Sequence, residues 1–140
     1  MLLLGRRIGE SVYILQPDKP LLKLNLISYS LVNNFAQISW EYYHHHSKND
    51  SITPDRFLII PGKTNPIFGL SVKFSPEREV PVKLVLDIPK KEIIAYREEY
   101  LERLMPYLID NFRRDRLHPI SKGDLRKLEN KIRDYEATRR

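Results

Sequence analysis

Short runs of β-prone residues, separated by turn-forming residues, make up most of the first 90 positions of the chain. The first two runs, residues 2–4 and 12–14, flank a turn-like segment that contains Arg6, Arg7 and Gly9. A strand that begins at residue 2 has to be held by neighbouring strands, because chain ends fray unless a sheet ties them down. We therefore predict two short strands joined at Gly9, with both arginines fixed at the end of the first strand.

A β-hairpin is predicted over the next two runs. Residues 22–26 alternate leucine with polar residues, which is the period-two pattern of a strand with one buried face. Residues 35–42 alternate in the same way, and Asn33 and Asn34 between the runs tolerate the positive φ of a tight turn. The inward-facing set of the second run is then Ala36, Ile38 and Trp40.

Two further strand-like runs, residues 57–60 and 67–74, follow the hairpin. The connection between them, residues 61–66, is rich in turn formers. We expect this part of the chain to add a hairpin to the sheet or to fold against it.

Three consecutive histidines, at positions 44–46, raise the question of a metal site. Successive side chains of an extended segment point to different sides, so at most His44 and His46 could share an ion, and no partner of metal-ligand spacing follows. We therefore predict no metal, and a polar loop that continues through residues 47–50.

The last third of the chain has helical spacing. Glu98 and Glu99 suit the positive end of a helix dipole, and Pro106 suits either the first position of a continuing helix or a kink. Ser121 and Asp124 form a capping box before a last helix. The apolar stripe of the first helical segment is Leu101, Leu104, Met105, Leu108 and Phe112, and that of the last is Leu125, Leu128, Ile132 and Tyr135.

Composition excludes several classes of protein. The 140 residues correspond to one domain, or one small domain with appendages. The absence of cysteine excludes disulfides, a thiolate nucleophile and a cysteine zinc site, and fits a reducing compartment. No apolar run reaches membrane length and no secretory leader is evident, so we expect a soluble cytoplasmic protein.

The net charge of +6 is concentrated near the carboxyl end. Residues 103–140 contain eleven Lys or Arg against six Asp or Glu, a surplus of five positive charges. Such a basic segment attracts polyanions such as RNA by sequence-independent electrostatics, although a solvated helix face of mixed charge has the same composition.

Two separated segments resemble one known family. The pattern L-x-L-x-R-R-x-G-E-x-x-x-I in residues 2–14 resembles the amino terminus of the carbon storage regulator family (CsrA/RsmA), which are small bacterial RNA-binding proteins that control translation. Residues 82–100, VKLVLDIPKKEIIAYREEY, resemble the closing strand of that family and the Arg-Glu-Glu that opens its helix. Residues 23–43 resemble its central hairpin more weakly. Residues 44–80 and the chain after residue 105 are not covered.

The resemblance implies a mainly β fold with C-terminal α-helices, a small β-barrel or sandwich formed by an interlocked, strand-exchanged homodimer. It divides the chain into a β domain at 1–105, with an insertion at about 44–80, and a basic helical extension at 106–140. Either 35–43 or 82–88 matches the fourth strand of the family, and we favour the first. One extra residue at Lys90–Lys91 predicts a β-bulge there, because an uncompensated residue would turn later side chains to the opposite face.

The function implied by the resemblance is post-transcriptional regulation of translation. In that family, the first strand of one subunit and the last strand of the other bind GGA in hairpin loops of mRNA leaders. Arginine suits this task because its guanidinium matches guanine O6 and N7 and can also stack on a base. Carried over to this sequence, the RNA-binding residues are Leu4, Arg6, Arg7, Ile93, Ala95 and Arg97. The implied partners are mRNA, small regulatory RNA, a second copy of the chain, and a protein antagonist or paralogue, without a membrane, cofactor or metal.

Three alternatives stand beside this interpretation. The arginines could pair only with Glu10, Glu98 and Glu99 and hold the structure together. The chain could be a divergent paralogue that acts through protein contacts, by exchanging strands with a related protein or by binding a partner. An enzyme is not predicted, because no paired carboxylates, glycine-rich phosphate loop or Ser/His/Asp spacing is present and His118 is isolated.

Overall fold

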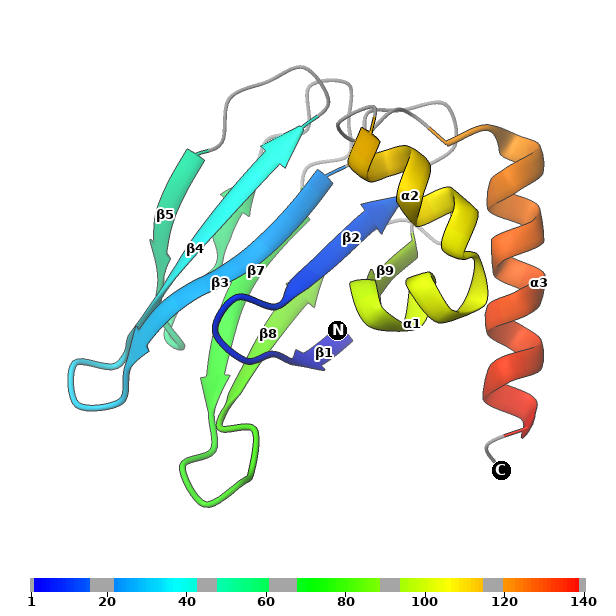
Figure 1. Ribbon diagram of the computed structural model, residues 1–140. Helices are drawn as coiled ribbons and strands as arrows, with labels where there is room; N and C mark the ends of the chain where they lie inside the picture. Colours follow the sequence, from blue (N-terminus) through cyan, green and yellow to red (C-terminus); the bar gives the residue numbers. More distant parts are fainter. Residues whose placement is uncertain are drawn as a thin grey trace.

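The computed structural model describes residues 2–15, 22–42, 48–60, 68–88, 94–114 and 120–138. Two antiparallel sheets pack face to face, and three helices lie against one of them (Figure 1). The fold is thus mainly β with C-terminal helices, as the sequence predicts.

The strands fall into a four-stranded and a five-stranded sheet. The four-stranded sheet has the order β1 (Leu2–Gly5), β8 (Val82–Asp87), β7 (Phe68–Phe74) and β6 (Leu58–Ile60). The five-stranded sheet has the order β5 (Lys48–Ile52), β4 (Phe35–Tyr42), β3 (Leu22–Ser30), β2 (Ser11–Leu15) and β9 (Ile94–Arg97). The helices are α1 (Glu98–Leu104), α2 (Pro106–Arg114) and α3 (Lys122–Thr138).

The two sheets are built alike. Strands β1 to β4 form a first half and strands β5 to β8 a second half. When each strand is replaced by its counterpart in the other half, the order β1-β8-β7-β6 of the four-stranded sheet becomes β5-β4-β3-β2, which is the order of four strands of the five-stranded sheet. In each half, the first strand leaves its own half and pairs with the fourth strand of the other half. Among the described strands, β9 has no counterpart.

Two hydrophobic cores hold the layers together. Apolar residues of β3, β4, β7 and β8 face one another between the sheets, and burial alternates along β8 and along β3 from Leu22 to Leu26. The other core lies outside the five-stranded sheet, where Tyr13 and Leu15 of β2 meet the helices. Its helical members are Leu101, Met105, Leu108, Ile109, Phe112, Ile120, Leu125 and Leu128.

Most of the predicted elements are present. The β3–β4 hairpin is confirmed, and Asn34 in its turn has a φ of 59°. The predicted strands of the insertion pair with each other as β6 and β7. Pro106 is the first residue of α2, and the backbone N–H of Asp124 donates to Ser121 Oγ at the start of α3.

One prediction is wrong, one is refined by the sheet order, and two lie outside the described residues. The polar loop predicted through residues 47–50 is wrong, because Lys48–Ile52 form strand β5 and pair with β4. The first two strands are confirmed but are not neighbours, since β1 and β2 belong to different sheets. The histidines at 44–46 and the bulge predicted at Lys90 are outside the described residues.

The first strand has a neighbouring strand within its own chain. The resemblance places β1 beside the last strand of a second subunit, whereas β1 pairs with β8 of its own chain, with Leu4 opposite Leu84. The last strand, β9, pairs with β2 of the same chain. The two segments considered for a fourth strand form β4, the last strand of the first four, and β8, the last strand of the next four.

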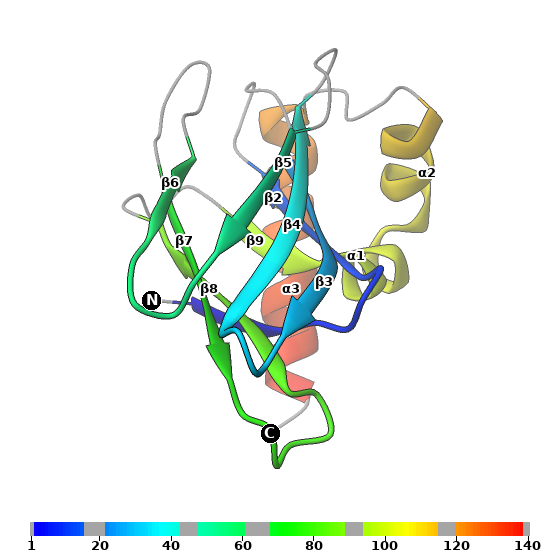
Figure 2. The same cartoon turned by 90° about the vertical axis from the view of Figure 1, so that its left-hand side faces the viewer.

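The helices are part of the fold. They contact β2 and β9, and no described helix covers the outer face of the four-stranded sheet (Figure 2). Within the described residues, none of the helices combines the length and apolar character needed to cross a membrane. In the described part of the chain, the outer face of the four-stranded sheet is therefore open to a ligand.

Candidate functional site

The end of β1 and the end of β9 lie side by side in one chain. A Cβ placed on Gly5 would be 3.9 Å from Arg97 Nη2 and 3.4 Å from Val80 Cγ1. A larger side chain at position 5 would compete with Arg97 for this space. The two segments that the resemblance assigns to one binding site are thus adjacent without a second subunit.

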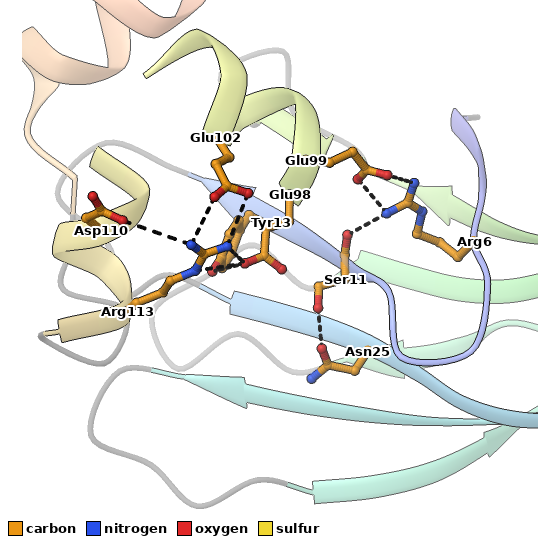
Figure 3. Close-up of polar contacts among 9 residues, drawn as sticks. All are labelled: Arg6, Ser11, Tyr13, Asn25, Glu98, Glu99, Glu102, Asp110 and Arg113. Atoms are coloured by element: carbon orange, nitrogen blue, oxygen red, sulfur yellow. Dashed lines mark hydrogen bonds and ion pairs between the residues drawn. The ribbon is translucent and has the colours of Figure 1, made fainter. Parts of the chain in front are cut away.

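Arg6 is buried at this junction, with only 4% of its surface exposed. Its Nη1 and Nη2 each donate to one carboxylate oxygen of Glu99 at 2.7 Å, and Nη1 also donates to the carbonyl of Ser11 at 3.1 Å (Figure 3). A fork of two parallel bonds fixes both the position and the plane of the guanidinium. Arg6 therefore joins β1 to α1, as the structural alternative for the arginines predicts.

The same pair controls the ionisation of Glu99. Partial burial opposes ionisation, but hydrogen bonds from Arg6 and from the backbone N–H of Glu99, with the positive charges of Arg6 and Arg97, outweigh it and lower the pKa of Glu99. The carboxylate is charged at neutral pH and remains available to Arg6.

The other predicted site residues divide between the core and the surface. Leu4 and Ala95 are each 7% exposed and pack between the sheets, and Ile93 is outside the described residues. Arg7 is 58% exposed and makes one long contact of 3.4 Å with the exposed Glu79. Of the predicted set, Arg7 is exposed and Arg97 is half-buried, and both lie outside the two hydrophobic cores.

Arg97 lies in a cluster of aromatic and basic side chains. Its guanidinium carbon is 5.4 Å from the ring centroid of Tyr100, and Arg103 lies over the same ring at 5.8 Å. Tyr100 also contacts the rings of Tyr96 and Tyr135, with centroids 5.9 and 5.8 Å away. Cation–π contacts of this kind orient a guanidinium while leaving its N–H groups available for a ligand.

Two lysines extend this positive charge over the outer face of the four-stranded sheet. Lys83 of β8 pairs with Gly5 on one side and with Lys73 of β7 on the other, so both lysines lie in the row that ends at Arg97. We call Arg97, Lys83 and Lys73 the cationic row. Neither lysine forms an ion pair with any residue of the described ranges. The two lysines therefore carry positive charge that no carboxylate of the described residues pairs with.

An apolar groove of about 510 Å³ runs beside the cationic row. It follows the next row of the sheet, where Leu3, Val85 and Ser71 are neighbours. Phe57 forms another wall and is held over Gly69, whose Cβ position would be only 3.1 Å from the Phe57 ring. The face thus offers a line of cations next to exposed apolar surface.

A second charged cluster lies on the helical side of the molecule. Arg113 contacts Glu98 at 2.8 Å and Glu102 at 3.2 Å, and these bonds raise the pKa of Arg113 (Figure 3). Burial, followed by the charge of Glu98, raises the pKa of Tyr13 beneath it. Because its charges are paired with one another, this cluster ties α1 to α2 and offers little to a ligand.

The strand lysines of the cationic row were not singled out from the sequence. Lys83 lies between the buried Val82 and Leu84, an alternation that places it outward. Its neighbours across the sheet, however, depend on a pairing between β1 and β8 that the sequence does not specify. The sequence signal was thus sufficient to orient Lys83 and insufficient to place it beside Arg97.

No group of three His, Asp or Glu residues suited to hold a metal ion occurs in the described parts of the chain. Comparison with known proteins adds no assignment: no family model, no curated protein and no solved structure matches this chain.

Proposed function

We propose that the protein is an RNA-binding regulator that takes a single-stranded, GGA-containing loop of an mRNA leader across the outer face of the four-stranded sheet. The observation that carries the proposal is the position of Arg97, held on Tyr100 beside β1 and continued by Lys83 and Lys73. The GGA preference comes from the resemblance of residues 2–14 and 82–100 to the carbon storage regulator family.

The chemistry of the face suits single-stranded RNA. Unstacked bases bind to aromatic and apolar side chains, while a line of cations follows the phosphates. Lys83 and Lys73 supply that line, and Leu3, Val85 and Phe57 supply exposed apolar surface beside it. Arg97 can donate two parallel hydrogen bonds to guanine. The protein would act by occupying the transcript, without catalysis or a cofactor.

A direct test is a gel-shift titration with a GGA-containing hairpin and with the same hairpin carrying a scrambled loop. The proposal requires tighter binding of the GGA hairpin at fixed salt. Equal affinity for both loops would leave only non-specific attraction to phosphates.

Arg97→Ala should weaken binding of the GGA hairpin by about 1–3 kcal/mol, which is the range for one bidentate base contact. The measurement is the dissociation constant of the variant against that of the parent. Arg114→Ala is the matched control, because Arg114 is exposed at the end of α2 and bonds only to Asn111 among the described residues. Equal losses in the two variants would show that only net charge matters.

The exposed apolar side chains of the same face favour a second candidate function, binding of a protein partner. Leu3, Phe57 and Ile59 are 46%, 38% and 57% exposed. If the chain binds no RNA, and Phe57→Ser abolishes co-purification of one defined partner while leaving the fold intact, the protein-contact function replaces RNA binding.

A further inference from the structure

The two halves of the molecule have the same strand register at a constant offset of 46 residues. Val12 pairs with Leu24 between β2 and β3, and Leu58 pairs with Leu70 between β6 and β7. The β1–β8 and β5–β4 pairs obey the same offset, because Leu2 is opposite Leu86 and Lys48 is opposite Trp40. The match holds without a gap as far as Leu26 opposite Ile38 and Val72 opposite Leu84. Beyond this point β3 and β4 have a register shift that places Ser28 opposite Gln37, whereas β7 and β8 continue to Phe74 opposite Val82.

The buried residues follow the same offset. Leu22, Ala36 and Ile38 correspond to Phe68, Val82 and Leu84, and all six are core residues. The turn between the first two strands is also repeated. The backbone N–H of Glu10 donates to the carbonyl of Arg7, and 46 positions later Thr53 and Arg56 form a β-bridge.

We infer that the chain is an internal duplication whose two halves exchange their first strands, so that one chain closes the interlocked fold by itself and has a single RNA-binding edge. The inference rests on the proposed function only for the nature of the ligand. The duplication itself rests on strand order and register.

The first edge is the end of β1 beside β9, where Arg6, Arg7 and Arg97 lie. The corresponding second edge, at β5, lacks these arginines. The counterpart of Arg6 is Ile52, which is 2% exposed in the core, and the counterpart of Arg7 is the uncharged Thr53. Leu4 corresponds to Asp50, a carboxylate that accepts a hydrogen bond of 2.8 Å from Trp40 Nε1. A carboxylate repels RNA phosphates, so this edge disfavours the ligand of the first.

Among the described residues, the last strand and the helix that follows it also have no counterpart at the second edge. Strand β9 and α1 add Arg97, Glu99 and Tyr100 next to β2 and β1, whereas no described strand pairs with the outer side of β6. The second edge therefore lacks both the arginines of a first strand and the arginine of a last strand. One chain should bind one loop, and it should not join two loops of the same transcript.

Strand exchange within one chain can be tested without RNA. Leu3 and Val85 face each other across β1 and β8, and the chain has no cysteine of its own. The Leu3→Cys/Val85→Cys variant should oxidise to a covalent monomer that migrates faster than its reduced form on a denaturing gel. Each single-cysteine variant is the control and should show no such shift. A covalent dimer that forms from the double variant and from neither control would overturn the duplication.

Native mass spectrometry of the parent protein with a GGA hairpin tests the single edge. With a single-loop hairpin, the expected complex contains one chain and one RNA. With a transcript that carries two GGA loops and with excess protein, the expected complex contains two chains and one RNA, because each loop takes its own chain. A single chain with two RNAs, or a dimer with two, would refute the single edge. Loss of all RNA binding would refute the proposed function, while the disulfide result would still decide the duplication.

Discussion

Phe112→Ala should lower the free energy of unfolding by about 3–5 kcal/mol, the usual cost of removing a buried aromatic ring. Phe112 of α2 is 3% exposed, and its ring meets that of Tyr13 edge to face at a centroid distance of 5.9 Å. The substitution leaves a cavity at the place where the helices meet β2. Because Tyr13 is fully buried in the same contact, the surrounding side chains have little freedom to close that cavity.

Urea denaturation of parent and variant measures the loss. Tyr107→Ala is the matched control, since Tyr107 is an aromatic residue of the same helix but is 49% exposed, and its loss should cost well under half as much. A Phe112→Ala variant as stable as the control would mean that α2 does not dock on β2. The basic carboxyl-terminal segment would then be an extension, as the sequence predicts.

Local patterns in the sequence were sufficient for most elements. The alternation in 22–26 and 35–42 fixes which face of β3 and β4 is buried, because a strand has a period of two. The stripe that contains Leu101, Leu108 and Phe112 likewise predicts the buried side of α1 and α2. These patterns do not say which surface the stripe covers, and so residues 106–140, which form α2 and α3, were assigned to an extension.

The sequence was insufficient where pairing decides the structure. Strand β5 reads as a loop because Lys48, Asn49 and Asp50 are polar, yet an edge strand with one solvated face tolerates such residues. The duplication was missed because corresponding positions, such as Ala36 and Val82, share only apolar character. Packing requires an apolar side chain of suitable size there and does not preserve its identity.

The same reasoning separates the two roles of arginine at the β1–β9 edge. Arg6 and Arg97 both lie there, but among the described residues it is Arg6 that is buried and bonded to a carboxylate. Its partner, Glu99, is 93 residues away, so no local pattern could identify the pair. Arg97 is held by the Tyr100 ring, which leaves its hydrogen-bond donors for a ligand. The structural Arg6 thus positions the edge at which we propose that Arg97 binds RNA.

Glu99→Ala should therefore destabilise the fold by about 2–3 kcal/mol, somewhat below the cost of breaking a fully buried pair, because Glu99 itself is 42% exposed. The variant leaves the Arg6 guanidinium buried without its counter-charge. Arg6→Leu should cost less, since it removes the buried charge and leaves a carboxylate that water can solvate. The isoleucine at the corresponding position of the second half, Ile52, indicates that an apolar residue fits such a site. Equal losses in the two variants would contradict this asymmetry.

The pH dependence of stability gives an independent measurement of the Arg6–Glu99 pair. The pKa of Glu99 is lowered in the folded protein, so the ionised carboxylate stabilises the fold above its unfolded pKa of about 4.3. This contribution is lost as the pH falls through the lower, folded pKa, because the unfolded chain then binds the proton more readily. Urea denaturation at pH 7 and at about pH 3 should show a smaller acid-induced loss for Glu99→Gln than for the parent protein. If both lose the same stability on acidification, Arg6 does not hold Glu99 in its charged form, and the joint between β1 and α1 rests on packing alone.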